Sequence, residues 1–378
     1  MKTTTRFTLA AGAMLLALSA TAAEKYPPLG PLPPPPIPKD NPNTPAKVEL
    51  GKKLFWDNRL SGDGSMPCVS CHIPGLGWGE GSQISRGYPG TKHWRNSQTV
   101  LNSAYYNKPF WEGSVTSLEQ QAPAAAGGGV SGNGDDSLME MRLRFLPEYV
   151  KEFNQVFGSE WPRINDAWRA IAAYERTIIS DARKVPFDRY AMGDKKALSD
   201  SQKRGMVLYN GKANCIACHN GPLASNQKFY ATDVPAHPQF KEDPVGQVTH
   251  RWEWYQKGVN EKDYRGAKDD AGLFYITMNP KDIGKWRVPS LRELKYTGPF
   301  MHNGMLATLG DVVEFYNQGG GEAQNKTKLL KPLKLTAQEK KDLVAFLEAL
   351  SMDEPLLQDD PKLPGDYQPL PAPISAAK

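Results

Sequence analysis

Two pentapeptides decide the fold of this chain: CVSCH at Cys68–His72 and CIACH at Cys215–His219. Together they contain all four cysteines of the 378 residues. In each, a Cys-x-x-Cys pair is followed at once by histidine, which is typical of c-type haem attachment: both thiols bond to the porphyrin and the imidazole binds iron. Two disulfides would leave the histidines unexplained, and the pairs lie too far apart for common zinc sites. We therefore expect two covalently bound haems.

Each motif follows a predicted helix. Thr44 and Pro45 are start signals for AKVELGKKLFWD before the first motif, and Ser199 can cap DSQKRGMVLYNG before the second. Near the end, Thr336 and Glu339 can form a capping box for LTAQEKKDLVAFLEALS. Because no long strand pattern occurs, the fold class is mainly α, with two cytochrome c-like haem domains and long loops.

The domain organisation follows from these repeats and from the two ends of the chain. Lys2 and Arg6 precede an apolar run and small residues near Ala23, which is typical of a signal peptide. The expected parts are a signal peptide at 1–23, a proline-rich lead-in at 24–45, domains at 46–190 and 191–351, and a proline-rich tail at 352–378.

Composition narrows the location and the partners. The signal peptide predicts an exported, periplasmic protein, and no later stretch is long and apolar enough to predict a membrane span. The net charge of +5 comes from scattered basic residues among nearly as many acids, so nucleic acid is not an expected partner. We expect an extended lead-in, long loops over 220–285 and a loosely attached tail after Ser351.

Several segments, in order and spacing, resemble the bacterial dihaem cytochrome c peroxidase superfamily. They include ELGKKLFWDNRLS, RNSQTVLNSAYYNKPFWEG, LPEYVKEF and RVPSLRELKYTGPFMHNG, besides the two haem motifs, and span roughly 46–351. The resemblance implies that the haem at His72 meets hydrogen peroxide. It also implies that the haem at His219 stores or relays an oxidising equivalent.

The second ligand of the C-terminal haem divides this superfamily. Peroxidases place a methionine fourteen residues after the histidine that matches His302, and here that position is Tyr316. Tyrosine there resembles the MauG and MbnH-type branch, whose members oxidise tryptophan on a partner protein. A phenolate is a hard anionic ligand that favours ferric iron, whereas thioether sulfur raises the reduction potential. The alternative is that Tyr316 only packs and that Met301 or Met305 binds iron.

The same resemblance implies roles for other residues. Trp111 occupies the position of a tryptophan between the haems that can carry electrons, and Gln121 matches a glutamine beside the peroxide site. Asn96, Thr297 and Pro299 match an inter-haem calcium site with oxygen ligands.

Two positions depart from the peroxidase pattern. Ser131 stands where the family has its catalytic glutamate, and a hydroxyl cannot replace a carboxylate in acid–base catalysis. Three explanations stay open: Asp135 or Asp136 takes that role, Gln121 and water suffice, or peroxide activation is slow or absent. The family's removable histidine ligand is replaced by Tyr88, and we expect nearby His93 at the surface. Because no histidine would block it, we expect the iron of the first haem to be five-coordinate and open to peroxide.

Three functions remain. The preferred one is a haem-dependent oxidoreductase that uses peroxide to oxidise a residue on a partner protein, with tryptophan as the favoured residue. The second is a peroxidase supplied with electrons by a small redox protein. The third is an electron carrier or redox sensor without peroxide chemistry. The sequence leaves the partner and the oligomeric state open.

Overall fold

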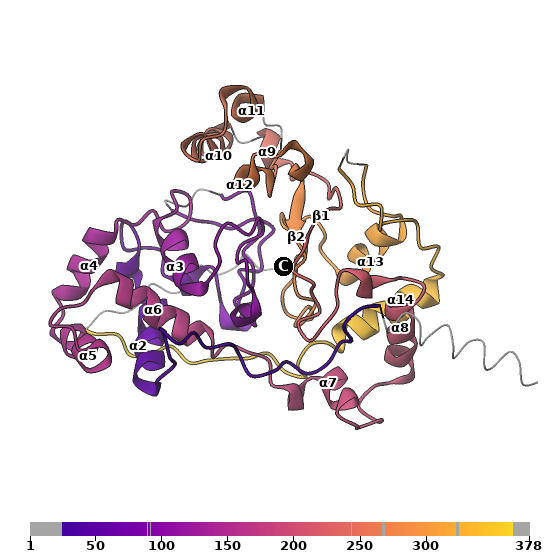
Figure 1. Ribbon diagram of the computed structural model, residues 1–378, viewed down its shortest axis with the longest axis horizontal. Helices are drawn as coiled ribbons and strands as arrows, with labels where there is room; N and C mark the ends of the chain where they lie inside the picture. Colours follow the sequence, from indigo (N-terminus) through magenta and orange to yellow (C-terminus); the bar gives the residue numbers. More distant parts are fainter. Residues whose placement is uncertain are drawn as a thin grey trace, which may run out of the picture.

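The structure is a computed structural model that describes residues 25–88, 90, 92–242, 244–266, 269–322 and 325–365. The expected signal peptide and the last part of the tail lie outside this range. The described chain is mainly helical, as predicted, and its two halves lie side by side with a helical segment above their junction (Figure 1). None of the described helices is long and apolar enough to cross a membrane.

The N-terminal half is built on a helix pair, α2 (Pro45–Trp56) and α6 (Ile164–Glu175). The Thr44 side chain accepts from Lys47 N–H, and Pro45 occupies the first turn, so the predicted start of α2 is confirmed. Gly51 lets the helices approach closely, because a Cβ there would lie 1.9 Å from the Ala170 carbonyl oxygen. The other helices are α3 (Leu118–Gly127), α4 (Asp136–Arg144) and α5 (Pro147–Phe157).

The C-terminal half repeats this arrangement with α8 (Asp200–Asn210) and α14 (Ala337–Glu348). Both predicted caps are present as full capping boxes, on Ser199 and on Thr336. A Cβ at Gly205 would lie 1.9 Å from the Asp342 carbonyl oxygen, so glycine again permits a close helix crossing. Between them lies α13 (Leu309–Asn317). The domain boundary that we propose after residue 190 falls at the end of α7 (Pro186–Ala191).

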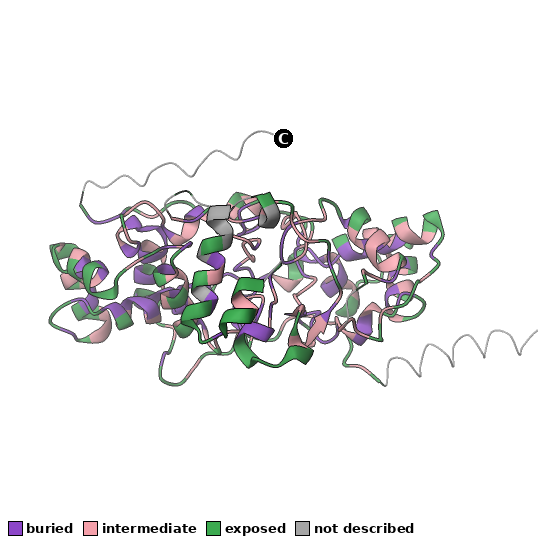
Figure 2. Ribbon diagram, turned by 90° about the horizontal axis from the view of Figure 1, so that it is seen from above, coloured by how far each residue is buried: buried purple, intermediate pink, exposed green. Residues whose placement is uncertain are grey.

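The segment expected to form long loops over 220–285 instead contains four helices, so that prediction is wrong in part. They are α9 (Gln239–Glu242), α10 (Pro244–Gln256), α11 (Glu261–Gly266) and α12 (Phe274–Thr277). Strands β1 (Phe229–Ala231) and β2 (Lys285–Arg287) pair antiparallel below them. The helices escaped prediction because they pack through a few aromatic side chains around a small separate core, without a regular apolar stripe. Seen from above, they cover the middle of the molecule and expose much of their surface (Figure 2).

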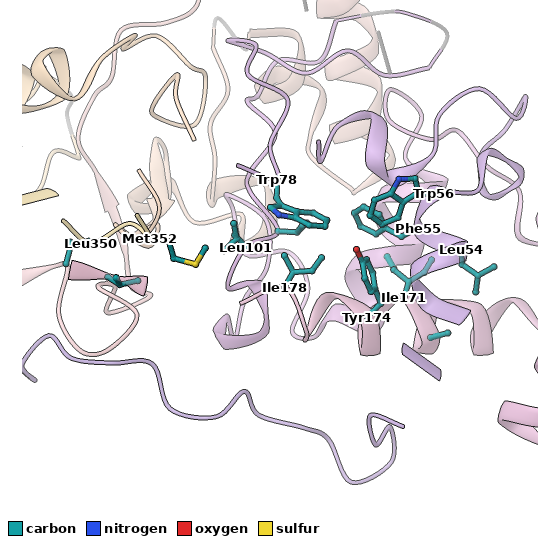
Figure 3. Packing of buried hydrophobic residues seen from close by; sticks show 14 of the residues in the cluster. Leu54, Phe55, Trp56, Trp78, Leu101, Ile171, Tyr174, Ile178, Leu350 and Met352 are labelled. Atoms are coloured by element: carbon teal, nitrogen blue, oxygen red, sulfur yellow. The ribbon is translucent and has the colours of Figure 1, made fainter. Parts of the chain in front are cut away.

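The main core continues through both halves. Next to the first haem motif, Phe55, Trp56, Trp78 and Tyr174 pack edge to face or tilted, with ring centroids 5.3 to 6.5 Å apart (Figure 3). Such contacts add stability beyond the burial of apolar area.

Two extended segments cross from one half to the other along the same side (Figure 1). The lead-in accepts hydrogen bonds at Pro27 and Gly30 from the C-terminal half and reaches α2. The tail runs back over the N-terminal core, where Trp78 Nε1 donates to Leu356 O at 2.8 Å and Trp56 Nε1 donates to Asp360 Oδ1 at 2.9 Å. Over 352–365, the prediction of a loosely attached tail is therefore wrong.

Candidate active site

Both haem motifs form the same local structure. In the first, the short turn η2 (Cys68–Ser70) lets Cys71 N–H and His72 N–H donate to the Cys68 carbonyl, at 3.2 and 3.1 Å. This turn places two thiols and an imidazole within five residues of a tight loop. His72 Nδ1 lies 3.2 Å from Trp78 O and must donate to it, so Nε2 is the nitrogen left to bind a metal.

The second motif repeats each of these features. Turn η6 (Cys215–Ala217) precedes His219, whose N–H donates to the Cys215 carbonyl at 2.9 Å. His219 Nδ1 lies 3.1 Å from Ala224 O, which again leaves Nε2 for a ligand bond. None of the four cysteines forms a disulfide, so the disulfide alternative is not realised. The donor set of each motif fits a covalent haem.

Each motif opens into a cavity of its own. The first cavity, of about 300 Å³, is bordered by Cys68, Cys71 and His72. The second cavity, of about 460 Å³, is bordered by the cysteines and histidine of the second motif. The two cavities share a wall that includes Asn96–Thr99, Tyr106 and Trp111.

Trp111 lies within this shared wall, where the resemblance places it. Its Nε1 donates to Asn96 O at 2.9 Å, which fixes the plane of the indole. On the side of the second cavity the ring centroid of Trp111 lies 6.5 Å from that of His302, which stacks on Trp286 at 3.9 Å. Of these three rings, Trp111 borders both cavities, whereas His302 and Trp286 border the second.

The polar residues expected in the first cavity are only partly available for chemistry. Gln121, on α3, borders the cavity, as does Ser131. The Ser131 hydroxyl donates to Ala125 O at 2.7 Å and thus closes the loop after α3, which is a structural role. Asp135 caps α4 by accepting from Leu138 N–H at 2.9 Å, and the exposed residue Asp136 begins that helix. Neither aspartate is among the residues that border the cavity.

The structure adds a carboxyl group that the sequence analysis missed. Glu175, the last residue of α6, borders the first cavity, is 3% exposed, and has no hydrogen-bond partner at Oε2. Burial raises the pKa of Glu175 to about 8 in spite of the adjacent Arg176 guanidinium. The other carboxylate in the wall, Glu112, is paired with Arg95 and accepts from the Ser114 hydroxyl at 2.8 Å. Glu175 is therefore the carboxyl in this cavity whose proton is not committed to another side chain.

His93 was expected at the surface, and the structure places it half-buried beside the first cavity. Its ring stacks on Trp94 with centroids 4.3 Å apart, and both residues border the first cavity. Burial lowers the pKa of His93 to about 3, so the imidazole is neutral at physiological pH. Tyr88, the residue in register with the family's histidine, donates from its backbone N–H to Ser131 O at 2.8 Å. The missed signal was the neighbouring tryptophan, whose apolar face covers the imidazole.

Tyr316 lies near the end of α13 and borders the second cavity. Burial, followed by the nearby Cys218 and Cys215 thiols, raises the pKa of its phenol above the ordinary value. A phenolate here consequently requires a cation beside it. Met301 borders the same cavity, whereas Met305 is not among its bordering residues.

The three residues expected to bind calcium are all found around the second cavity. Asn96, Thr297 and Pro299 all border it, although they come from both halves of the chain. Asn96 Nδ2 donates to Ser82 O at 2.8 Å, so its Oδ1 is the amide atom left for a hard cation. No cluster of three or more histidine, cysteine, aspartate or glutamate residues suited to a metal occurs in the described ranges. A cation between the cavities would therefore rely on neutral oxygen atoms.

Comparisons with known proteins agree with this geometry. A family model described as di-haem cytochrome c peroxidase matches residues 45–196. The chain is 70% identical over 362 residues to the cytochrome-c peroxidase IdrP1 of Pseudomonas sp. (strain SCT), covering 96% of each. It is 35% identical over 330 residues to the methylamine utilization protein MauG of Methylorubrum extorquens, covering 87% of this chain and 84% of MauG.

A solved structure described as a MauG-like protein associated with microbial copper homeostasis has the same fold. It superimposes with a TM-score of 0.72 at 30% identity and covers 85% of this chain and 94% of that one. The twin haem motifs, the paired cavities and the relatives that match along nearly the whole chain lead to one conclusion. This protein belongs to the di-haem cytochrome c peroxidase family.

Proposed function

We propose that this protein reduces hydrogen peroxide to water in the first cavity, using electrons from a small redox protein. The observation that carries the proposal is the joint presence of a haem motif, Gln121 and the unpartnered Glu175 around one cavity. When bound there through Cys68, Cys71 and His72, a haem supplies the iron at which the peroxide O–O bond is cleaved. The name of the relative from Pseudomonas sp., a cytochrome-c peroxidase, supports this choice.

Two side chains of the first cavity have separate roles in this reaction. Cleaving the O–O bond to give two waters consumes two protons and two electrons, so a group must deliver a proton to the departing oxygen. Glu175 can hold this proton at Oε2, because its burial keeps the carboxyl protonated at neutral pH. The Gln121 amide can orient peroxide by donating from Nε2. Glu175 thus replaces the glutamate that the chain lacks at Ser131.

The second cavity serves as the entry point for electrons. Cys215, Cys218 and His219 would hold a second covalent haem, and Tyr316, on α13, would supply a further ligand to its iron. Trp111 borders both cavities and can pass an electron from one to the other. A calcium ion bound by Asn96, Thr297 and Pro299 would hold the two halves in register. The expected signal peptide supports a periplasmic location for this reaction.

Steady-state kinetics of the holoprotein test this proposal. With a reduced small cytochrome c and peroxide, we expect two molecules of cytochrome oxidised for each peroxide consumed. A protein that binds both haems yet leaves peroxide unchanged would be an electron carrier or sensor, and the proposal would be wrong.

A second candidate function is oxidation of a residue on a partner protein, with tryptophan as the favoured residue. Tyr316 favours it, because a phenolate ligand lowers the potential and makes the second haem a poor acceptor from a small cytochrome. The likeness to MauG and to a MauG-like structure supports it as well. In this case the partner's residue supplies both electrons. Peroxide consumption that remains slow with reduced cytochromes, but oxidises a tryptophan on an added protein, would decide for it.

A further inference from the structure

A group of aromatic side chains connects the first cavity with the surface of α10. Trp254 borders the cavity and is 1% exposed, and its ring stacks on Tyr275 with centroids 3.5 Å apart. Tyr264 packs against the cluster that these two residues form. Tyr255 lies 5.2 Å from Tyr264, measured between ring centroids.

The outer end of this group is open to solvent. Tyr255 stacks on Trp252 with centroids 5.4 Å apart, and the two residues are 50% and 55% exposed. Large aromatic side chains are usually covered in a folded protein, so an exposed stacked pair needs a reason. None of these five residues lies in the wall shared by the two cavities.

We propose a second electron route, which joins the first cavity to the surface without using Trp111. It is formed by Trp254, Tyr275, Tyr264, Tyr255 and Trp252. Indoles and phenols are the side chains most readily oxidised by one electron. Rings in contact allow the resulting electron vacancy to move from one side chain to the next in short steps. The inference rests on the peroxide reaction proposed above, which supplies the oxidant.

The surroundings of Trp254 supply the proton acceptor that such a step needs. The Arg95 guanidinium and Lys257 Nζ lie 5.6 and 4.4 Å from the Trp254 ring, and their charges oppose a positive charge on the indole. Trp254 Nε1 donates to His250 Nδ1 at 2.9 Å. Burial lowers the pKa of His250 to about 3, so the ring is neutral and one nitrogen accepts the indole N–H; its low basicity makes transfer of that proton readily reversible. Loss of the electron together with this proton leaves a neutral radical.

The electrons balance along the whole route. Trp254 gives one electron towards the first cavity while its indole proton moves to His250. That proton returns when Trp254 is refilled from Tyr275, whose hydroxyl lies 3.5 Å from His250 Nε2, and Tyr275 is refilled in turn from the surface pair. A one-electron donor that touches Trp252 completes the cycle. With no donor present, Trp252 gives up two electrons in succession and takes an oxygen atom from water. In that case one peroxide and one tryptophan become water and hydroxytryptophan.

Peptide mapping of the holoprotein after peroxide treatment without a donor tests the route. We expect oxygen incorporation at Trp252 several-fold above that at Trp161, a control tryptophan of similar exposure, 49%, in the N-terminal half. Tyr275→Phe keeps the ring stack but removes an oxidisable step, so it should lower labelling of Trp252 several-fold. Equal labelling of both tryptophans, or labelling unchanged by Tyr275→Phe, would overturn the route.

Two further measurements separate failure of the route from failure of the proposed function. Peroxide loss measured in the same samples reports the peroxidase reaction directly. A soluble photo-oxidant applied to the ferrous holoprotein tests the route with no peroxide at all. Trp252→Phe should then slow oxidation of the haem in the first cavity several-fold, whereas Trp161→Phe should not. Equal rates in these two variants would exclude the route even if the protein consumed no peroxide.

Discussion

Replacing Asp270 by asparagine should loosen the helical segment that covers the first cavity. Asp270 receives two hydrogen bonds from Arg95, from Nε to Oδ2 at 2.5 Å and from Nη2 to Oδ1 at 3.0 Å. Both side chains are at least nine-tenths buried, and the pair joins the N-terminal half to the loop before α12. Arg95 also contacts Glu112, so the variant would leave Arg95 with one of its two carboxylate partners.

The size of the effect follows from this geometry. Removing one partner of a buried ion pair costs 3 to 5 kcal/mol, and the remaining contact to Glu112 favours the lower end, about 3 kcal/mol. At 1.4 kcal/mol for each tenfold change, the open form of the segment should become about a hundred times more populated. Amide hydrogen exchange followed by mass spectrometry should show this as faster exchange over 254–275.

A matched surface variant provides the control. Asp282→Asn removes a pair with Lys285 Nζ at 2.9 Å, which is more exposed and should be worth less than about 1 kcal/mol. Exchange over 254–275 that is no faster in Asp270→Asn than in Asp282→Asn would refute the reasoning.

The same pair gives the segment an acid sensitivity. Burial opposes ionisation of Asp270, but the charge and hydrogen bonds of Arg95 outweigh it and hold its pKa below the ordinary value. A carboxyl with a depressed pKa in the folded state stabilises that state above its unfolded pKa, about 4, and this stability is lost as the pH falls further. Protection over 254–275 should therefore decline below about pH 4, and less steeply in Asp270→Asn.

Three further predictions concern the site and the tail. Tyr316→Met should raise the reduction potential of the second haem in a redox titration and leave that of the first haem unchanged. A second-haem potential equal in the variant and the wild-type protein would exclude tyrosine as its ligand. Glu175→Gln should slow the stopped-flow reaction with peroxide about a hundred-fold at equal haem content, and an unchanged rate would assign the proton to another group. Asp360→Ala should lower the free energy of unfolding by about 1 to 3 kcal/mol in denaturant titrations, because Trp56 Nε1 loses its acceptor, while Asp359→Ala should not.

Local sequence rules predicted much of the framework. Helix caps at Thr44, Ser199 and Thr336 depend only on residues within one turn, and all three are present. The haem motifs are equally local, since four consecutive positions fix the turn that carries them. The mainly helical class followed from the same patterns.

What the sequence did not reveal depends on contacts between distant segments. Glu175 reads as an ordinary residue of an amphipathic helix, and only the packing of α3 on α6 places it beside Gln121. The tail has the composition of a linker, but its carbonyl and carboxylate oxygens meet buried indole donors about 280 to 300 positions away. Such pairings leave no periodic signal. For the same reason His93 was misplaced.

The two crossing segments also constrain the order in which the molecule can assemble. Residues of the lead-in are made before either half of the molecule, yet Gly30 accepts its hydrogen bond from Arg292, 262 positions later. The tail is made last and closes over the earliest helices. Neither segment can complete its contacts before both halves of the chain have been made, so the docked segments clamp the two halves only in the finished chain.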